Sequence, residues 1–455
     1  MTGRETMIDG LGQMAANREQ RRLAVAWLGL GVTALALAGI FAILLVVARI
    51  PGTSALFPTQ DFFRIALIVH VDQSVLIWFL AFAGVLWSLE GQASPAIARS
   101  AFAIAAIGCL LVAAAPFLGA GNPLLNNYVP VLDHPLFLVA LAVFSAGILL
   151  QVLAYVPRGI AAMSWSDPVS VGIATAAIAA LVAAGSFLWT WLALPTQWEG
   201  KAYYEYLFWG PGHVLQFAYT QIMIVAWIWL LRATGRPIGL RAGWVSAFLV
   251  LGILPLVAVP LIHGSYAPDA PETRLAFITL MQWGNGLAAV PLGLLITFAL
   301  LRHRREPVPQ EHRAAHLALA WSLVLFAAGG ILGALIAGVN TIIPAHYHGS
   351  IVGVTLALMG LTYHLLPKLG FGPATGRMAR LQPILYGAGQ LVHIGGLAAS
   401  GALGIQRKTA GAAQGLDGVW VKAFMGIMGL GGLLAVIGGI LFVLVVLRAF
   451  LRRTA

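Results

Sequence analysis

The chain consists of long apolar runs separated by short polar stretches. Each run has about twenty residues, the length that an α-helix needs to cross the hydrocarbon core of a bilayer. Because the runs are continuously apolar instead of alternating, they favour helices over the strands of a membrane barrel. The sequence therefore predicts an all-α fold, a polytopic membrane bundle of twelve transmembrane helices. The twelve runs cover residues 23–47, 62–89, 100–118, 136–156, 169–194, 205–231, 242–262, 275–301, 316–340, 342–366, 382–402 and 422–447.

Composition supports this prediction and excludes a water-soluble enzyme. Of 455 residues, 60% are hydrophobic and only 9% are charged, whereas an ordinary soluble domain has roughly 25% charged residues. The loops between the runs are too short to hold a soluble domain. We therefore expect residues 1–455 to form a single membrane domain.

The chain is basic, and the position of its charges indicates a membrane topology instead of nucleic-acid binding. The 26 Lys and Arg residues, against 15 Asp and Glu, lie mainly in loops between apolar runs. If both termini are cytoplasmic, the inner side holds 19 of these cations and the outer side 7, as the positive-inside rule requires. The first run follows a polar, Arg-bearing segment without a small-residue cleavage site, so we expect a retained span. The sequence thus predicts a multi-pass protein of a bacterial-type inner membrane and no nucleic-acid partner.

Histidines are the unusual residues at membrane depth, where a titratable side chain is costly and indicates function. The single cysteine, Cys109, rules out a disulfide framework, a zinc cluster and a C-x-x-C-H haem attachment within this chain. Of the eleven histidines, six are expected to be solvated or structural. These are His303, His312 and His316 around the basic 302–313 loop, and the isolated His134, His364 and His393.

The other five histidines all fall in the outer half of the predicted bundle: His70, His213, His263, His346 and His348. Imidazole is the common protein ligand of haem iron and copper, and facing helices of a bundle supply such ligands. His346 and His348 project about 200° apart around one helix, because successive residues turn by about 100°. They cannot bind one metal together, but each can bind a different haem on its own side of the helix.

These residues resemble catalytic subunit I of the haem-copper oxidases and nitric oxide reductases. The segment Ile343-Pro344-Ala345-His346-Tyr347-His348 is similar to the H-x-H helix of that family. The resemblance implies that His346 binds a high-spin haem, and that His348 and His70 are the axial ligands of a low-spin haem. The pair Arg407-Lys408 is similar to the basic pair that neutralises haem propionates.

The resemblance also implies a second metal, copper or non-haem iron, held by His213 and His263. His213 ends the segment Gly210-Pro211-Gly212-His213, which is similar to the family's G-H segment. This chain departs from the family at Gly264, where a second adjacent histidine is usual. It departs again four residues after His213, where oxygen reductases often have a tyrosine and nitric oxide reductases often have a glutamate. Phe217 stands there instead, with Gln216 and Tyr266 as other possible donors.

The function implied is a respiratory oxidoreductase that takes electrons from a donor subunit, a cytochrome c or a quinol and reduces a diatomic gas. The missing tyrosine favours nitric oxide over O2, because two-electron coupling of nitric oxide needs no phenol as an electron and proton donor. A terminal oxygen reductase is the alternative. A non-catalytic haem-binding paralogue and a twelve-helix secondary transporter are further alternatives, although a transporter gives no reason for the H-x-H pattern and the sequence lacks the expected two-fold symmetry.

Overall fold

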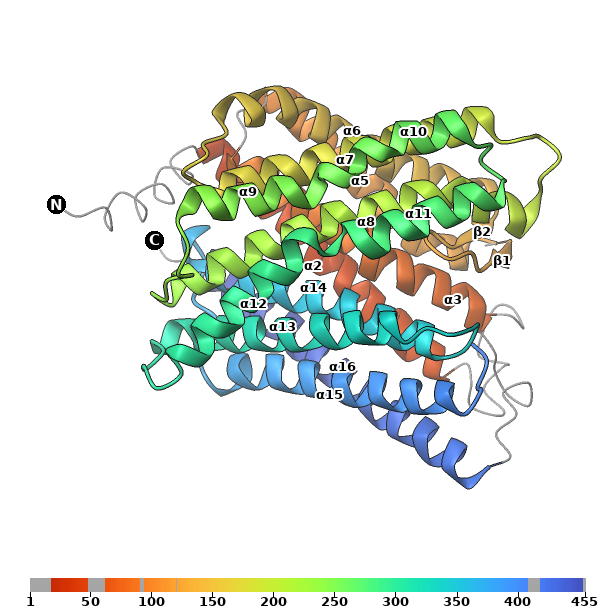
Figure 1. Cartoon of the computed structure of the whole chain (residues 1–455). Coiled ribbons are helices and arrows are strands. Elements are labelled where there is room, and N and C mark those ends of the chain that lie inside the picture. Colours follow the sequence, from red (N-terminus) through yellow and green to blue (C-terminus); the bar gives the residue numbers. More distant parts are fainter. Residues whose placement is uncertain (1–17, 48–61, 91–93, 120, 408–417, 453–455) are drawn as a thin grey trace. The chain divides into compact units, whose positions relative to one another are not determined.

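The computed structural model describes residues 18–47, 62–90, 94–119, 121–407 and 418–452 (Figure 1). Within these ranges the chain is almost entirely helical, and eleven helical segments are long and apolar enough to cross a membrane. The prediction of an all-helical, polytopic membrane bundle is confirmed. The predicted span 382–402 is also a helix, α15 (Arg377–Ala402), but it is not among the eleven. Its glutamines, His393 and many glycines make it less apolar than the other spans.

The helices form two compact units, which are described separately. Unit 1 comprises residues 1–225 and 240–294, and unit 2 comprises residues 226–239 and 295–455. Two helices, α8 (Gly200–Ala233) and α12 (Gly286–Arg302), contribute residues to both units. A single functional domain over the whole chain remains a prediction.

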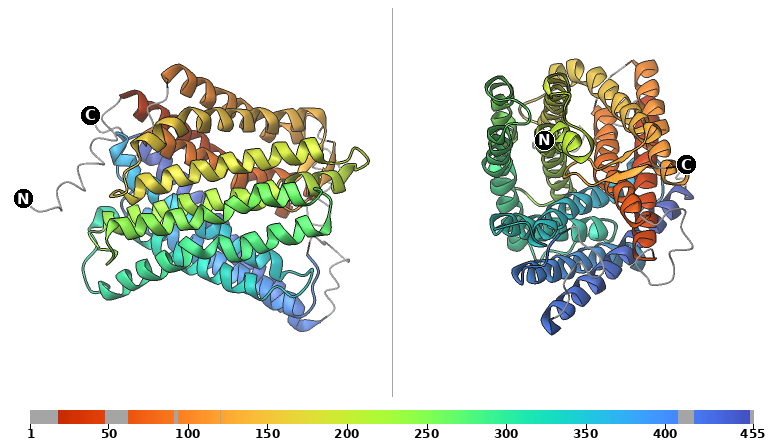
Figure 2. Two further views of the ribbon diagram at one scale, coloured as in Figure 1. Left: turned by 45° about the horizontal axis from the view of Figure 1, so that its top comes forward. Right: turned by 90° about the vertical axis from the view of Figure 1, so that its right-hand side faces the viewer.

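Unit 1 contains most of the N-terminal helices, which pack mainly against neighbours in sequence. Packed pairs are α2 with α4, α5 with α6, α6 with α7, and α7 with α9, and Figure 2 shows helices of this unit side by side. The bounds are α2 (Arg18–Val47), α3 (Phe62–Val71), α4 (Trp78–Glu90), α5 (Pro95–Ala114), α6 (Pro135–Ala162), α7 (Pro168–Ala193), α9 (Ala242–Ile253), α10 (Ala258–Ser265) and α11 (Pro271–Gly284).

Proline sets the start of several of these helices. Pro95, Pro135, Pro168 and Pro271 each occupy the first turn of a helix, where the missing N–H costs nothing because that donor has no partner inside the helix. The loop before α6 carries a short antiparallel pair, β1 (Asn122–Leu124) with β2 (Val131–Asp133), in which Pro123 faces Leu132. This hairpin fixes the ends of the loop 125–130, which reaches the candidate site.

Three interruptions divide predicted spans of unit 1. The span 62–89 contains a π-helical turn, Asp72–Ile77, directly after His70, and such turns often occur at functional sites. The Ser74 hydroxyl donates to the His70 carbonyl over 2.6 Å, which is consistent with a disturbed helical hydrogen-bond ladder.

A 3₁₀ turn, Leu254–Val257, separates α9 from α10 at Pro255. α11 ends at Gly284 and α12 begins at Gly286, so the predicted span 275–301 is bent at Asn285.

Unit 2 is built around α13 (Arg313–Ala334), α14 (Ile342–Lys368), α15 and α16 (Val419–Phe450) (Figure 1). α13 packs on α14 and α15, and α15 packs on α16. Glycines allow α13 and α14 to approach closely: a Cβ added at Gly349 would lie 2.6 Å from the Gly329 Cα, and one added at Gly329 would lie 2.3 Å from the Ser350 nitrogen. Small residues at such contacts are typical of membrane helices.

Candidate metal centre and haem ligands

His213 is buried on α8 and has one ring nitrogen committed to the protein. Its Nδ1–H donates to the Trp209 carbonyl over 2.6 Å. The carbonyl can only accept, so Nδ1 carries the proton and Nε2 of the neutral ring keeps a lone pair. Gly210 and Gly212 make room around it, because a Cβ at these positions would lie 2.8 Å from the Phe277 ring and 2.2 Å from the Tyr128 ring. The Gly-Pro-Gly-His segment therefore lets two aromatic rings pack beside the imidazole.

His263 is buried near the end of α10, and it too has one ring nitrogen beside a protein oxygen. Its Nε2 lies 2.8 Å from the hydroxyl oxygen of Ser186 on α7. Its Nδ1 is buried and has no hydrogen-bond partner. A buried polar atom without a partner is costly, and an absent ligand is one reason for it.

The two imidazoles lie against one aromatic ring, that of Phe277 on α11. The ring centroid of Phe277 is 6.2 Å from that of His213 and 5.3 Å from that of His263. The structure therefore places two histidines that are 50 positions apart in sequence beside the same ring, and their role as ligands of a second metal stays a prediction.

The structure shows no third His, Cys, Asp or Glu ligand beside the two histidines among the residues that it describes. No group of three or more His, Cys, Asp or Glu side chains that could hold a metal occurs there. Gln216 and Tyr266 make no hydrogen bond or ring contact with the two histidines in these ranges. A Cβ at Gly264 would meet nothing within 4 Å, and Gly264 has no left-handed backbone. The glycine is therefore not required by packing or by φ.

A charged network fixes the carbonyl that orients His213. The Trp209 ring lies under the Arg274 guanidinium, with 4.3 Å between Cζ and the ring centroid, and the Trp209 indole N–H donates to the Arg274 carbonyl over 3.2 Å. Arg274 in turn lies 3.9 Å from a carboxylate oxygen of Glu205, which accepts hydrogen bonds from Asn127. Trp209 is thus held from two sides.

A phenol lies beside the candidate metal centre, although Phe217 provides none. The Tyr128 ring centroid is 4.6 Å from that of His213 and 5.8 Å from that of Trp209. Burial, and to a lesser extent the charge of Glu205, raise the pKa of Tyr128 above its usual value, so this phenol keeps its proton at neutral pH. Tyr128 comes from the loop 125–130, far from His213 in sequence.

His70, the predicted low-spin haem ligand of unit 1, is oriented by α2. Its Nδ1–H donates to the Ala38 carbonyl over 2.8 Å, which leaves Nε2 as the nitrogen that can bind a metal. Below it, Gln73 fills the π-helical turn and donates to the Cys109 carbonyl over 3.0 Å. The lone cysteine therefore has a structural role in the packing behind His70.

His346, the predicted high-spin haem ligand of unit 2, is oriented in the same way by α13. Its Nδ1–H donates to the Gly329 carbonyl over 2.7 Å. The bond depends on the glycine contact between the helices, because a Cβ at Gly333 would lie 2.6 Å from the His346 Nδ1. A backbone carbonyl that accepts the hydrogen bond from Nδ1 fixes the tautomer and the orientation of a metal-binding histidine.

His348 lies two positions further along α14 and contacts aromatic rings. Its ring centroid is 5.1 Å from that of Tyr347 and 5.0 Å from that of His393 on α15. The Nδ1–H of His393 donates to the Met428 carbonyl over 2.9 Å, which is the arrangement also seen at His70 and His346. The pairing of His348 with His70, which belongs to unit 1, stays a prediction.

Arg407 is held beside the start of α14, while Lys408 lies outside the described residues. The Thr341 N–H donates to the Ile405 carbonyl over 3.0 Å, and Asn340 forms an isolated antiparallel bridge with Gln406. These contacts attach the segment that carries Arg407 to the first turn of the H-x-H helix. The predicted role of the basic pair at haem propionates stays a prediction.

The remaining histidines are mostly structural. His134 caps α6, because its Nδ1 accepts a hydrogen bond from the Leu136 N–H over 3.2 Å. His303 pairs with Glu306 over 2.6 Å, and His312 lies 3.6 Å from Glu311. His316 and His364 each have one buried ring nitrogen without a hydrogen-bond partner.

Sequence reasoning missed the residues that support the two buried histidines. Ser186, Phe277 and Tyr128 come from segments without any motif, and only the fold brings them together. Only Trp209 could have been anticipated from the sequence. It lies four residues before His213, and a side chain in a helix can reach the backbone carbonyl four residues earlier.

Comparisons with known proteins show the family of this chain. A family model described as cytochrome c and quinol oxidase polypeptide I matches residues 22–434. The chain belongs to this family. The resemblance to haem-copper oxidase subunit I is therefore confirmed. An uncharacterized protein of Rickettsia prowazekii (strain Madrid E) is 30% identical, covering 92% of this chain and 94% of the relative. Another, from Aquifex aeolicus (strain VF5), is 28% identical, covering 78% of this chain and 88% of the relative.

A solved structure shares the fold. It is described as a heme-copper terminal oxidase dimer, and it matches with a TM-score of 0.69 at 16% identity, covering 97% of this chain and 86% of that chain. Members of the oxidase family typically bind haems and a metal. The residues present fit such groups, because His70, His213 and His346 each use Nδ1 on a backbone carbonyl and leave Nε2 available, and because the Nδ1 of His263 is buried without a partner.

Proposed function

We propose that this chain is the catalytic subunit of a membrane oxidoreductase that reduces a diatomic gas, with nitric oxide as the preferred substrate over O2. Electrons would come from a donor subunit, a cytochrome c or a quinol. The low-spin haem would be held by His70 and His348, the high-spin haem by His346, and the second metal, copper or non-haem iron, by His213 and His263.

One observation carries the proposal: the arrangement of His213 and His263 around Phe277. Two imidazoles from two helices are buried on one aromatic ring, each has one nitrogen hydrogen-bonded to the protein, and each has one nitrogen uncommitted. The buried Nδ1 of His263 has no hydrogen-bond partner, and leaving such a nitrogen unpaired costs about 1–3 kcal/mol, which a bound metal would offset.

The haems and the metal, when bound, would supply the electrons and hold the gas at adjacent metal ions. The chain's own residues position these groups and exclude water. The Trp209 carbonyl and the Ser186 hydroxyl fix the rotation of the two imidazoles, which a metal site needs for its geometry. The apolar ring of Phe277, which is fully buried, keeps the space beside both imidazoles dry.

The preference for nitric oxide rests on the side chains beside His213. Reduction of two nitric oxide molecules by two electrons and two protons forms an N–N bond, breaks one N–O bond, and gives nitrous oxide and water. Full cleavage of O2 needs four electrons, and oxygen reductases of the family often use a phenol four residues after the first copper ligand. Phe217 occupies that position here, and its ring, which has no hydroxyl, is fully buried.

Tyr128 favours the second candidate, O2 reduction. Its ring lies on that of His213 with 4.6 Å between centroids, so a phenol is present from a different part of the chain. If it replaces the missing tyrosine, the subunit is a terminal oxygen reductase.

Turnover on the two gases in parallel separates these candidates. The purified complex, in wild-type and Tyr128→Phe form, is supplied with a chemical reductant and a redox mediator, and the consumption of nitric oxide and of O2 is recorded. Tyr266→Phe is the matched control, because Tyr266 is exposed. We expect nitric oxide turnover in all three forms. O2 turnover that exceeds it and is lost only in Tyr128→Phe would establish the oxygen reductase instead. An absence of both, with intact haem spectra, would indicate the non-catalytic paralogue.

A further inference from the structure

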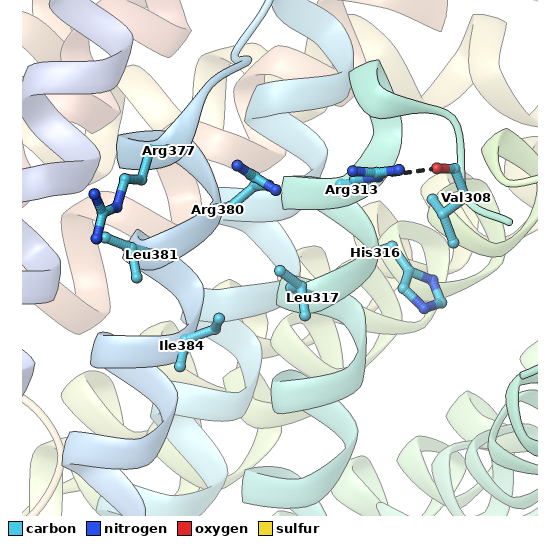
Figure 3. Close-up of a pocket in the computed structure, with 8 residues that line it drawn as sticks. All are labelled: Val308, Arg313, His316, Leu317, Arg377, Arg380, Leu381 and Ile384. Atoms are coloured by element: carbon cyan, nitrogen blue, oxygen red, sulfur yellow. Dashed lines mark hydrogen bonds between the residues drawn. The ribbon is translucent and has the colours of Figure 1, made fainter.

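A pocket that the haem chemistry does not use lies in unit 2, where α13 and α15 begin (Figure 3). Its volume is about 530 Å³. Both helices start at this end, at Arg313 and Arg377, and they pack against each other along their length. The lining has two parts. The basic part consists of Arg313, His316, Arg377 and Arg380, and the apolar part consists of Val308, Leu317, Leu381 and Ile384.

The basic part places three arginines where α13 and α15 begin. Arg313, Arg377 and Arg380 all lie in the first turn of a helix, where the aligned peptide dipoles add further positive potential. Arg313 is held in place, because its Nε–H donates to the Val308 carbonyl over 3.2 Å. Among the described residues, no carboxylate forms an ion pair with any of the three arginines. The described part of the chain therefore supplies no ion-pair partner for these arginines, so an anion would stabilise them.

The apolar part follows about one helical turn further into each helix. Leu317 lies four residues after Arg313, and Leu381 and Ile384 lie four and seven residues after Arg377, so each helix presents a cation and then an apolar side chain on the same face. Leu381 and Ile384 remain 39% and 36% exposed. α13 is one of the membrane-spanning helices, so the order from cation to leucine runs from the headgroup level toward the acyl level.

We propose that this pocket binds an anionic phospholipid, with its phosphate at the three arginines and an acyl chain along Leu317, Leu381 and Ile384. Charge complementarity selects this occupant: a zwitterionic lipid would place a second cation near the arginines, and a free phosphate would leave the leucines uncovered. Basic pockets between membrane helices are typical sites of anionic lipid headgroups. By the positive-inside distribution of the chain, the lipid belongs to the cytoplasmic leaflet.

The test measures lipid binding to the purified, delipidated full chain in detergent by native mass spectrometry. The probes are phosphatidylglycerol and phosphatidylcholine with the same acyl chains. The pocket variant is Arg313→Gln/Arg377→Gln/Arg380→Gln. The loop variant, Arg302→Gln/Arg304→Gln/Arg305→Gln, removes the same charge from three exposed arginines outside the pocket. Haem content and elution volume show whether each variant is folded.

We expect wild type to prefer phosphatidylglycerol, and the pocket variant to bind it at least about tenfold more weakly. The loop variant should stay within about twofold of wild type. Equal weakening in both variants, or no preference in wild type, would overturn the proposal. Glycerol phosphate and inorganic phosphate at millimolar concentration should not displace the lipid, since they lack an acyl chain. Displacement would show that the pocket is a site for a soluble anion instead.

Discussion

A methyl group at Gly333 should disturb the ligation of the high-spin haem, and the effect follows from the contact between α13 and α14. The Cβ of an alanine at this position would lie 2.6 Å from the His346 Nδ1 and 2.8 Å from its Cε1, whereas ordinary van der Waals contact begins at 3.4 Å. The imidazole nitrogen must therefore retreat by about 0.8 Å. The hydrogen bond from Nδ1 to the Gly329 carbonyl, now 2.7 Å, is lost or weakened.

Losing this hydrogen bond should affect turnover more than stability. A net hydrogen bond contributes about 1 kcal/mol to stability, so the chain should still fold. The effect on function should be larger, because changing an outer-shell partner of a metal ligand typically costs about 10–100-fold in affinity or activity. We therefore expect Gly333→Ala to reduce turnover by at least about tenfold while the low-spin haem remains.

The assay is the carbon monoxide difference spectrum of the reduced protein, which reports the high-spin haem, together with the low-spin spectrum as a measure of folding. Gly330→Ala is the matched control. Gly330 lies on the same helix as Gly333, and a Cβ added there would meet nothing within 4 Å. The control should be indistinguishable from wild type. Normal carbon monoxide spectra and turnover in Gly333→Ala, or an equal loss in both variants, would refute the reasoning.

Three further experiments test the sites predicted from the sequence. His70→Ala and His348→Ala should each abolish the low-spin haem spectrum and leave a high-spin haem, and a low-spin signal surviving in both would contradict the assignment. Arg407→Gln with Lys408→Gln should lower the haem reduction potentials in a redox titration, because positive charge near propionates stabilises the reduced state, and unchanged potentials would mean an ordinary solvated pair. Gly264→His should raise the second-metal content measured by elemental analysis without loss of folded protein, since its Cβ has open space; aggregation or unchanged content would argue against a missing third ligand.

The sequence predicted the helical architecture well because length and apolarity alone decide whether a segment can cross a bilayer. It failed to show the interruptions, for example at Asn285, since one continuous apolar run carries no sign of a bend. Hydropathy marks α15 less clearly than the other spans, because glycine and His393 lower its mean hydropathy without preventing a helix.

The candidate site was predictable where histidine itself is the signal. A titratable residue at membrane depth stands out in any apolar run, which is how His213 and His263 were found. Their supports were not predictable, because a backbone carbonyl such as that of Gly329 leaves no trace in the sequence. Ser186 and Tyr128 are equally invisible, since one serine or tyrosine among many indicates nothing until the chain is folded.

The central claim, that His213 and His263 hold a second metal, is tested most directly by copper and iron content per haem in the purified protein. Wild type should contain copper or non-haem iron beyond its two haem irons, at less than one equivalent because only two imidazoles hold it. His213→Ala and His263→Ala should each lose this metal and keep both haems, while His134→Asn, a change at the α6 cap, should keep all three. A wild type without a second metal, or one that retains it in both alanine variants, would contradict the claim.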